Sequence, residues 1–483
     1  MSVGCFLRVY FISIATILGT GILGLPVTLY SCGFFPFLIV FTLVLFAQVC
    51  VVFAFVELLQ RTDASLVKLS NELRPISAIV PEQVESTSDS AVDSEVTERA
   101  EHSSTLHDGI PVVAESAPVA SLFTMSVLYL RNTLVRFLFE LIVLVHFISI
   151  MTSYALAAPQ SFQQLFGLDV TSSFTATLLF VISCALLICL ILPGALNVVS
   201  VATGLKGIIL IVLIALVAAV SLRIGQPFEN RFHYIFDSFL IGTVSLGSVV
   251  NVMPVTWSQL GFQKDGRTVQ LYRIAVVLGV VTCYIFCTIW CLAVLLVVPQ
   301  TSSTNSLETA YKLGQISTVP LVSQLHQVNS VPKIVSFLVN GFICLSTTVS
   351  FLVMGSGLKN ALGGLLFRWT RLEGNGTTLV SRWKRVGEYK VRLGLYVSSF
   401  GLIALLAASN PHSFMRILEG FTSLCLNTEA GFFVGFMLLA SSSVVSPMEL
   451  KLPLRRYTIS ILGYFIEIFF ALAMLASIVY LIV

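Results

Sequence analysis

The sequence contains few charged residues. Asp, Glu, Lys and Arg make up 11% of its 483 residues, whereas apolar residues make up 56%. Soluble domains usually have about 25% charged residues, so this composition excludes a soluble domain. It predicts a multi-pass membrane protein that has the lipid bilayer as a partner. The net charge of +3 is too small for a basic nucleic-acid surface, so nucleic acid is not an expected partner.

Common catalytic and metal-binding motifs are absent as well. The sequence has no HExxH, no GxSxG and no P-loop, and its six histidines are scattered. Its ten cysteines show no CxxC spacing. We therefore predict that the protein is not an enzyme, uses no organic cofactor and holds no metal ion other than a coupling sodium ion.

Apolar segments of the length that crosses a bilayer, about 20 residues, recur along the whole chain. We predict eleven transmembrane spans, at residues 6–31, 35–59, 133–157, 173–193, 198–222, 236–261, 271–298, 333–357, 391–409, 413–440 and 456–482. The expected fold class is an all-α membrane protein with 11 transmembrane helices. Two five-helix units form an inverted repeat, with helices one and six broken, and one peripheral helix follows them.

Three regions divide the chain. Residues 1–59 carry spans one and two, residues 60–130 form a mostly disordered acidic cytoplasmic loop, and residues 131–483 carry spans three to eleven. The loop is predicted to be disordered because residues 75–120 are rich in acidic residues and serine, and such a segment cannot bury enough apolar surface to offset chain entropy. A cytoplasmic partner of residues 75–120 is a second expectation.

The distribution of Lys and Arg predicts the orientation. Most of the 27 basic residues, Lys206 counted among them, lie on the cytoplasmic side if the N-terminus is cytoplasmic. Eleven crossings then place the C-terminus on the outer or lumenal side. The plasma membrane and a vacuolar or lysosomal membrane both stay open.

The first span contains residues that weaken a helix. Gly19, Gly21, Gly24 and Pro26 lie within eight residues, and glycine costs about 1 kcal/mol and proline about 3 kcal/mol relative to alanine. The helix is therefore predicted to break or unwind here. In lipid, the freed backbone groups must face protein, a cavity or a ligand, which makes the break a candidate binding site. Close packing of small residues is the alternative.

The sixth span repeats this pattern five spans later. Gly242, Gly247 and Pro254 interrupt it, and the polar residues Ser245, Ser248 and Asn251 surround the interruption. Interrupted helices at corresponding positions of two halves are typical of inverted-repeat transporters, whose substrate binds near the middle of the bilayer.

Three motifs resemble those of a known family. ILGTGILGLP at 17–26 resembles the first-helix signature of the amino acid/auxin permease family, part of the amino acid-polyamine-organocation superfamily. VMPVTWSQL at 252–260 and STTVSFLVMGSGLKNAL at 346–362 are similar to its sixth-helix and eighth-helix motifs. The resemblance implies that an amino acid binds at the two breaks, with its carboxylate on free amides of helix one, where a positive helix end favours an anion. The implied substrate-binding residues are Thr16, Thr20, Gly21, Ile22, Leu23, Gly24, Ser245, Ser248 and Asn251.

The sequence is compatible with two coupling ions, sodium and the proton. Sodium would be held by oxygens near Thr16 and Gly19 with the hydroxyls of Thr347 and Thr348, although sodium-coupled relatives have an asparagine where this chain has Ala15. A proton would need a titratable group at membrane depth, since such groups are functional candidates. Glu429 is the first candidate, and His146 is interpreted as a packing residue.

The function that follows is transport. We predict a secondary active transporter that moves amino acids by alternating access, coupled to a proton or sodium gradient. A transporter-like amino-acid sensor, which binds without flux, and a channel are the alternatives.

Overall fold

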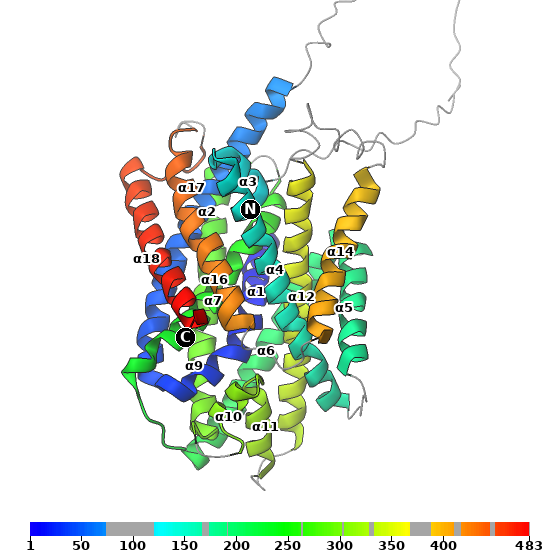
Figure 1. The fold of residues 1–483 in the computed structure, drawn as a ribbon, viewed down its shortest axis with the longest axis vertical. Helices are drawn as coiled ribbons and strands as arrows, with labels where there is room; N and C mark the ends of the chain where they lie inside the picture. Colours follow the sequence, from blue (N-terminus) through cyan, green and yellow to red (C-terminus); the bar gives the residue numbers. More distant parts are fainter. Residues whose placement is uncertain are drawn as a thin grey trace, which may run out of the picture.

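A computed structural model describes residues 1–73, 120–166, 173–190, 192–261, 264–301, 304–327, 333–367, 388–409, 417–444 and 450–482. Within these ranges every regular element is a helix (Figure 1). The helices in the first half are α1 (Val3–Cys32), α2 (Phe34–Leu73), α3 (Leu122–Tyr129), α4 (Thr133–Phe166), α5 (Ser173–Leu190), α6 (Leu192–Ile224), η2 (Phe232–Tyr234), α7 (Ile235–Gly247), η3 (Ser248–Asn251) and α8 (Met253–Ser258). Those in the second half are α9 (Gly266–Val297), α10 (Leu307–Lys312), α11 (Thr318–Gln327), α12 (Lys333–Phe367), α14 (Glu388–Ser409), η5 (Ile417–Thr422), α16 (Ser423–Leu426), η6 (Asn427–Phe433), α17 (Val434–Ser441) and α18 (Arg456–Ile482).

The described helices include nine that are long and apolar enough to cross a membrane, or ten when the bent helix α1 is counted as one span. A shorter apolar helix, Phe174–Cys189, lies within α5. The prediction of a multi-pass, all-helical membrane protein is confirmed, while the number eleven stays a prediction.

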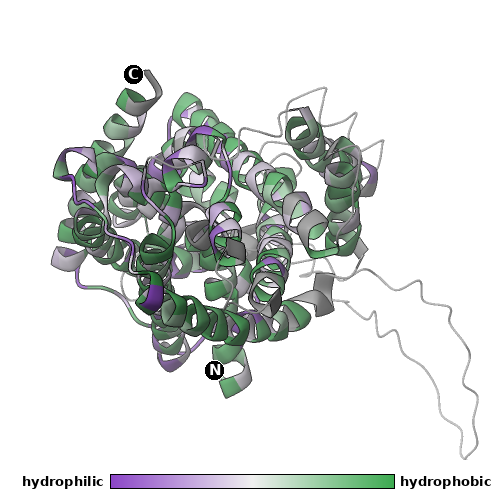
Figure 2. Ribbon diagram, turned by 90° about the horizontal axis from the view of Figure 1, so that it is seen from below, coloured by the Kyte–Doolittle hydropathy of each residue, from purple (hydrophilic) through white to green (hydrophobic). Residues whose placement is uncertain are grey.

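The sixth predicted span is the most enclosed part of the bundle. In the span that runs from η2 to α8, 94% of the most apolar stretch is buried, compared with 22% in α6 and 28% in both α14 and α18. Figure 1 shows α7 in the middle of the bundle, with α18 on one side and α5 and α14 on the other. Large apolar side chains such as Leu222, Val397 and Leu472 are exposed on the outer helices, and Figure 2 shows the rim of the bundle coloured mostly as hydrophobic. This rim is suited to contact with lipid tails.

Helix α1 bends instead of unwinding. Its halves, Val3–Gly19 and Gly24–Cys32, meet at an angle of 49°, yet the backbone keeps helical geometry from Val3 to Cys32. The predicted weak point is therefore at the right residues, but the structure absorbs the weakness as a bend. Glycines and a proline are common causes of such kinks.

The sixth span is interrupted as predicted, though slightly later in the sequence. The α-helix α7 ends at Gly247, four residues form the 3₁₀ turn η3, and α8 begins at Met253 with Pro254 in its first turn. Proline is tolerated there because the first turn of a helix has no intrahelical partner for that N–H.

Two sequence-based assignments need correction. Helix α2 continues to Leu73, well beyond the predicted end of span two at residue 59, and α3 lies inside the segment predicted to be loop. Residues 74–119, which include most of the predicted acidic loop, lie outside the described residues. Lys206 is not a cytoplasmic loop residue, because it is fully buried within α6.

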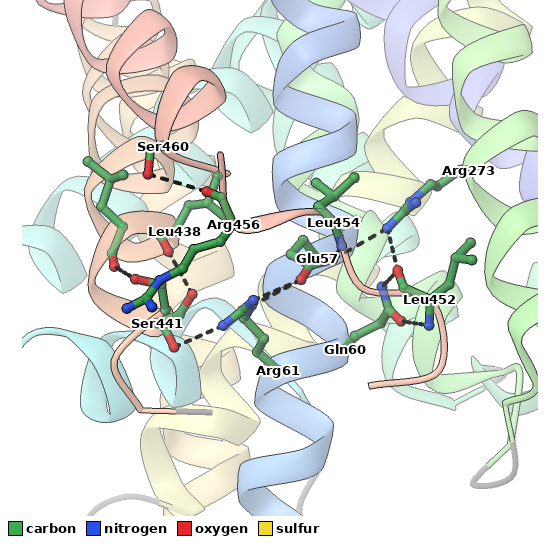
Figure 3. Close-up of polar contacts among 12 residues, drawn as sticks. Glu57, Gln60, Arg61, Arg273, Leu438, Ser441, Leu452, Leu454, Arg456 and Ser460 are labelled. Atoms are coloured by element: carbon green, nitrogen blue, oxygen red, sulfur yellow. Dashed lines mark hydrogen bonds and ion pairs between the residues drawn. The ribbon is translucent and has the colours of Figure 1, made fainter. Parts of the chain in front are cut away.

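A buried ionic cluster ties together the end of the bundle opposite α10 and α11 (Figures 1 and 3). Glu57 on α2 accepts hydrogen bonds from Arg61 Nε and Nη2 at 3.1 and 3.0 Å, and Arg273 Nη2 on α9 lies 3.5 Å from its other oxygen. The same carboxylate accepts a bond from the Leu454 backbone N–H at 3.2 Å. Glu57 and Arg61 are 0% and 1% exposed, so their charges are stabilised by each other and by backbone groups, not by water.

Candidate functional site

The bend of α1 packs against two serines of α12. Ser350 Oγ donates a hydrogen bond to the Ala15 carbonyl oxygen at 2.6 Å, and Ser346 Oγ lies 3.5 Å from the Leu18 carbonyl oxygen. These carbonyls belong to the last turn of α1 before the bend. Ser346 and Ser350 are one helical turn apart, so they share one face of α12. The two serines therefore stabilise the backbone of α1 next to its bend.

Gly19 allows this close approach. A Cβ atom at Gly19 would overlap Ser350 Oγ and would lie 2.6 Å from Ser350 Cβ and 2.6 Å from the hydroxyl oxygen of Tyr154 on α4. Any side chain at position 19 would have to displace these neighbours. Gly19 at the start of the bend therefore faces both Ser350 of α12 and Tyr154 of α4.

Sodium binding is predicted for the hydroxyls of Thr347 and Thr348 and for carbonyls near Thr16, but all three threonine hydroxyls bond their own helices. Thr16 Oγ1 donates to the Ile12 carbonyl at 2.8 Å, Thr347 Oγ1 to the Ile343 carbonyl at 2.8 Å and Thr348 Oγ1 to the Cys344 carbonyl at 2.7 Å. Each bond stays within its own helix, as is common for threonine in apolar helices. The role of these residues in ion binding stays a prediction, whereas Ser346 and Ser350 of α12 direct their hydroxyls at backbone carbonyls of α1.

The predicted anion site at the bend is described only in part. Thr20, Gly21, Ile22 and Leu23 lie in the helical backbone of α1, between the two halves that meet at the bend, but their side chains lie outside the described part of the chain. Gly24 is buried and begins the second half. The role of these five residues stays a prediction.

The interruption of span six carries buried polar atoms. Ser245 Oγ and Asn251 Oδ1 have no hydrogen-bond partner within the described ranges, although both residues are buried. Ser248 Oγ donates to the Val244 carbonyl at 2.6 Å. Buried polar atoms normally have a partner, so Ser245 and Asn251 are suited to contact a polar ligand.

The same two helices line both sites. A Cβ at Gly357 on α12 would lie 3.0 Å from Phe147 Cε1 on α4 and 3.1 Å from the Asn251 carbonyl oxygen. Two helical turns, about 10 Å, separate Gly357 from Ser350 on α12, and the same distance separates Phe147 from Tyr154 on α4. The bend of α1 and the break of span six therefore face the same α4–α12 pair, at points about 10 Å apart along these two helices.

A buried pair of titratable residues lies beside this region. His146 Nδ1 on α4 and Glu429 Oε2 on η6 are 2.7 Å apart, and both side chains are 0% exposed. His146 was interpreted from the sequence as a packing residue, and nothing in the sequence connects it with a glutamate 283 positions away. The structure makes it the direct partner of the predicted proton candidate.

Lys206 is a further buried polar residue that sequence reasoning placed wrongly. Its side chain is 0% exposed, and its Nζ has no hydrogen-bond partner in the described part of the protein. The thiols of Cys283 and Cys287 on α9 are its electrostatic neighbours. The sequence could have shown this burial, because Lys206 lies eight residues after the start of predicted span five, and a lysine within a membrane span is costly.

Removal of the Lys206 amine should stabilise the protein. We expect Lys206→Met to raise the free energy of unfolding by about 1–3 kcal/mol, because a buried donor without a partner costs about that much. Thermal unfolding in detergent, followed with a thiol-reactive dye, measures the change. Lys312→Met is the matched control, since Lys312 is 68% exposed and should leave the melting temperature almost unchanged. A lower melting temperature for Lys206→Met would mean that the amine has a stabilising partner.

Comparison with models of protein families shows that part of the chain is similar to permeases. The model of the tryptophan/tyrosine permease family matches residues 4–76, which cover α1 with its bend and α2. This family differs from the one that the three motifs resemble, so the agreement concerns permeases in general. No curated protein matches the chain by sequence.

The structure of MhsT shows the fold. The crystal structure of MhsT in complex with L-phenylalanine matches with a TM-score of 0.61 at 12% identity, over 98% of each chain. A manganese transporter of Eremococcus coleocola matches with a TM-score of 0.49 at 11% identity, over 98% of this chain and 85% of that chain. The chain therefore has the fold of MhsT, and its first two helices are similar to those of tryptophan/tyrosine permeases.

Proposed function

We propose that the protein is a secondary active transporter of amino acids that works by alternating access and is driven by an ion gradient. The observation that carries the proposal is the bent helix α1 next to the interrupted span six, both against α4 and α12. The permease match over residues 4–76 and the MhsT fold support the same function. The proposed architecture has eleven spans, with α5 as the fourth and α18 as a peripheral eleventh, and the first ten form an inverted repeat.

The substrate would bind between the two breaks. Its carboxylate would face the backbone of α1 from Thr20 to Gly24. Because α1 stays helical through the bend, these N–H groups would bind an anion once the bend opens and exposes the N-terminus of the second half. Its ammonium group would face Ser245 Oγ and Asn251 Oδ1, which lack partners among the described residues. The substrate would thus supply the hydrogen bonds that these buried atoms lack.

The aromatic amino acids are the first substrates to test. Tryptophan and tyrosine come from the name of the matching permease family, and L-phenylalanine is the ligand in the MhsT structure. Purified protein in liposomes should exchange internal unlabelled amino acid for external labelled amino acid, in a panel that begins with these three. Saturable exchange supports a transporter. Binding without exchange would favour a sensor, and absence of both for the whole panel would contradict the proposal.

Gly21→Val should abolish exchange while the protein is still expressed. A side chain at position 21 would occupy the space that the carboxylate must enter. Gly4→Val is the control, because a Cβ at Gly4 meets nothing within 4 Å. Amino-acid exchange in liposomes, normalised to reconstituted protein, measures the effect. Exchange at the wild-type rate in Gly21→Val would remove the carboxylate site from the proposal.

A further inference from the structure

The His146–Glu429 pair is isolated from water, and among the described residues no other charged side chain forms an ion pair with it. Both side chains are 0% exposed, and the two atoms at the outer ends of the pair, His146 Nε2 and Glu429 Oε1, have no hydrogen-bond partner among the described residues. The pair lies in the middle of two spans, Thr133–Pro159 and Gly420–Ser441. Such a pair is stable when it shares one proton and is net neutral, whereas loss of that proton leaves a buried negative charge that is costly in a medium of low dielectric constant.

Few of the described titratable groups surround the pair. The neighbouring η5 carries one more, Glu419, whose side chain lies outside the described residues. From α16, the Cys425 thiol is an electrostatic neighbour of Glu429, and α17 carries no titratable side chain. Glu467 on α18 packs against Gly435, Asp237 is at the start of α7, and Glu140 on α4 accepts a bond from Ser126. Lys359 on α12 lies over the ring of Tyr396 on α14. None of these is an ion-pair partner of His146 or Glu429 in the described structure, so the charge of the pair depends on the protons that the two residues themselves hold.

The helix that bears Glu429 is unusual and contacts the proposed substrate site. Glu429 belongs to a π-helical segment, Asn427–Phe433, and a second one, Ile417–Thr422, precedes it in the same span. π-Helical turns are rare and are found frequently at functional sites. Leu426, the residue before η6, lies close to Gly247, the last residue of α7, since a Cβ at Gly247 would be 2.9 Å from Leu426 Cδ2. The pair is thus connected to the break of span six through Leu426, the last residue of α16, directly before η6.

A second connection runs through α4. Phe147, directly after His146, contacts Gly357 beside the Asn251 carbonyl oxygen. A movement that exposes the pair to water would therefore shift elements on both sides of the span-six break. This arrangement is what coupling of a proton to substrate binding requires, because one conformational change must alter both sites.

We propose that the His146–Glu429 pair is the proton-coupling site of the transporter, which makes the proton the driving ion. This proposal rests on the proposed function. A proton from the outer or lumenal solution binds to the pair at Glu429 Oε1 or His146 Nε2, and the pair becomes net neutral. The neutral pair is compatible with the closed, dry conformation. The same proton leaves when the opposite side opens to water, so one proton crosses with each substrate molecule and no bond other than the one to the proton is formed or broken.

The experiment separates transport from coupling. Liposomes with wild-type protein and L-tryptophan, L-tyrosine or L-phenylalanine are assayed for exchange without a gradient, for accumulation under an imposed pH or sodium gradient, and for proton entry with an internal pH-sensitive dye. We expect the wild type to accumulate substrate under the pH gradient, with proton entry. Glu429→Gln and His146→Gln should keep exchange but lose the gradient-driven component and the substrate-dependent proton entry.

Glu467→Gln is the matched control and should behave as the wild type. If the wild type shows no exchange, the proposed function fails, whatever the variants do. If the wild type exchanges but accumulates substrate only under a sodium gradient, without proton entry, the coupling proposal is overturned. The coupling proposal is also overturned if Glu429→Gln keeps its pH-driven accumulation. It is likewise overturned if Lys206→Met loses this accumulation while the two pair variants keep it. If both pair variants fail to fold, proton entry with the wild-type protein still tests whether transport is coupled to protons.

Discussion

Gly19→Ala should strongly impair transport and lower stability. The new methyl group would overlap Ser350 Oγ and lie 2.6 Å from the Tyr154 hydroxyl, so Ser350 would lose its 2.6 Å hydrogen bond to the Ala15 carbonyl. Overpacking of this kind costs about 1–3 kcal/mol, which shifts a conformational equilibrium by about one to two powers of ten. Exchange of labelled amino acid in liposomes and the melting temperature in detergent measure the two effects.

A compensating variant tests the reason for the Gly19→Ala effect. Ser350→Gly in the Gly19→Ala background removes both Ser350 atoms that the methyl group would meet, so exchange and melting temperature should recover in part. Gly341→Ala on α12 is the control, because a Cβ there meets nothing within 4 Å. If the double variant is worse than Gly19→Ala alone, the close α1–α12 contact is not the cause of the loss.

Glu57→Gln should be the most destabilising substitution at the end of the bundle shown in Figure 3. The neutral amide would leave the buried guanidinium groups of Arg61 and Arg273 without their counter-charge. Breaking a buried ion pair by removing one partner costs about 3–5 kcal/mol. Thermal unfolding with the thiol-reactive dye should therefore show a clear fall in melting temperature.

Glu308→Gln provides a close comparison. Glu308 and Lys312 form an ion pair with the same spacing of four residues as Glu57 and Arg61, but the lysine is 68% exposed. Exposed pairs contribute about 0–1 kcal/mol, so this variant should melt close to the wild type. Equal effects for the two substitutions would show that burial does not strengthen the Glu57 cluster.

Much of the architecture could be predicted from local properties of the sequence. Apolar runs of about 20 residues predict membrane helices because the thickness of the bilayer sets their length. Gly19, Gly24 and Pro254 mark the bend and the break because helix propensity depends mainly on the residue itself. The degree of distortion could not be predicted, since it depends on how whole helices pack, and α1 stays helical through a segment whose composition disfavours a helix.

The composition of the sequence by itself determined the class of the protein, and its glycines and prolines determined where two helices are distorted, because both properties act over a few neighbouring residues. Only the tertiary structure decided which polar groups meet. In the segment STTVS at 346–350, helix packing turns the hydroxyls of Ser346 and Ser350 toward α1, while those of Thr347 and Thr348 bond their own helix. It also brings His146 to Glu429 and encloses Lys206. These contacts join distant parts of the chain, and their geometry depends on how whole helices pack.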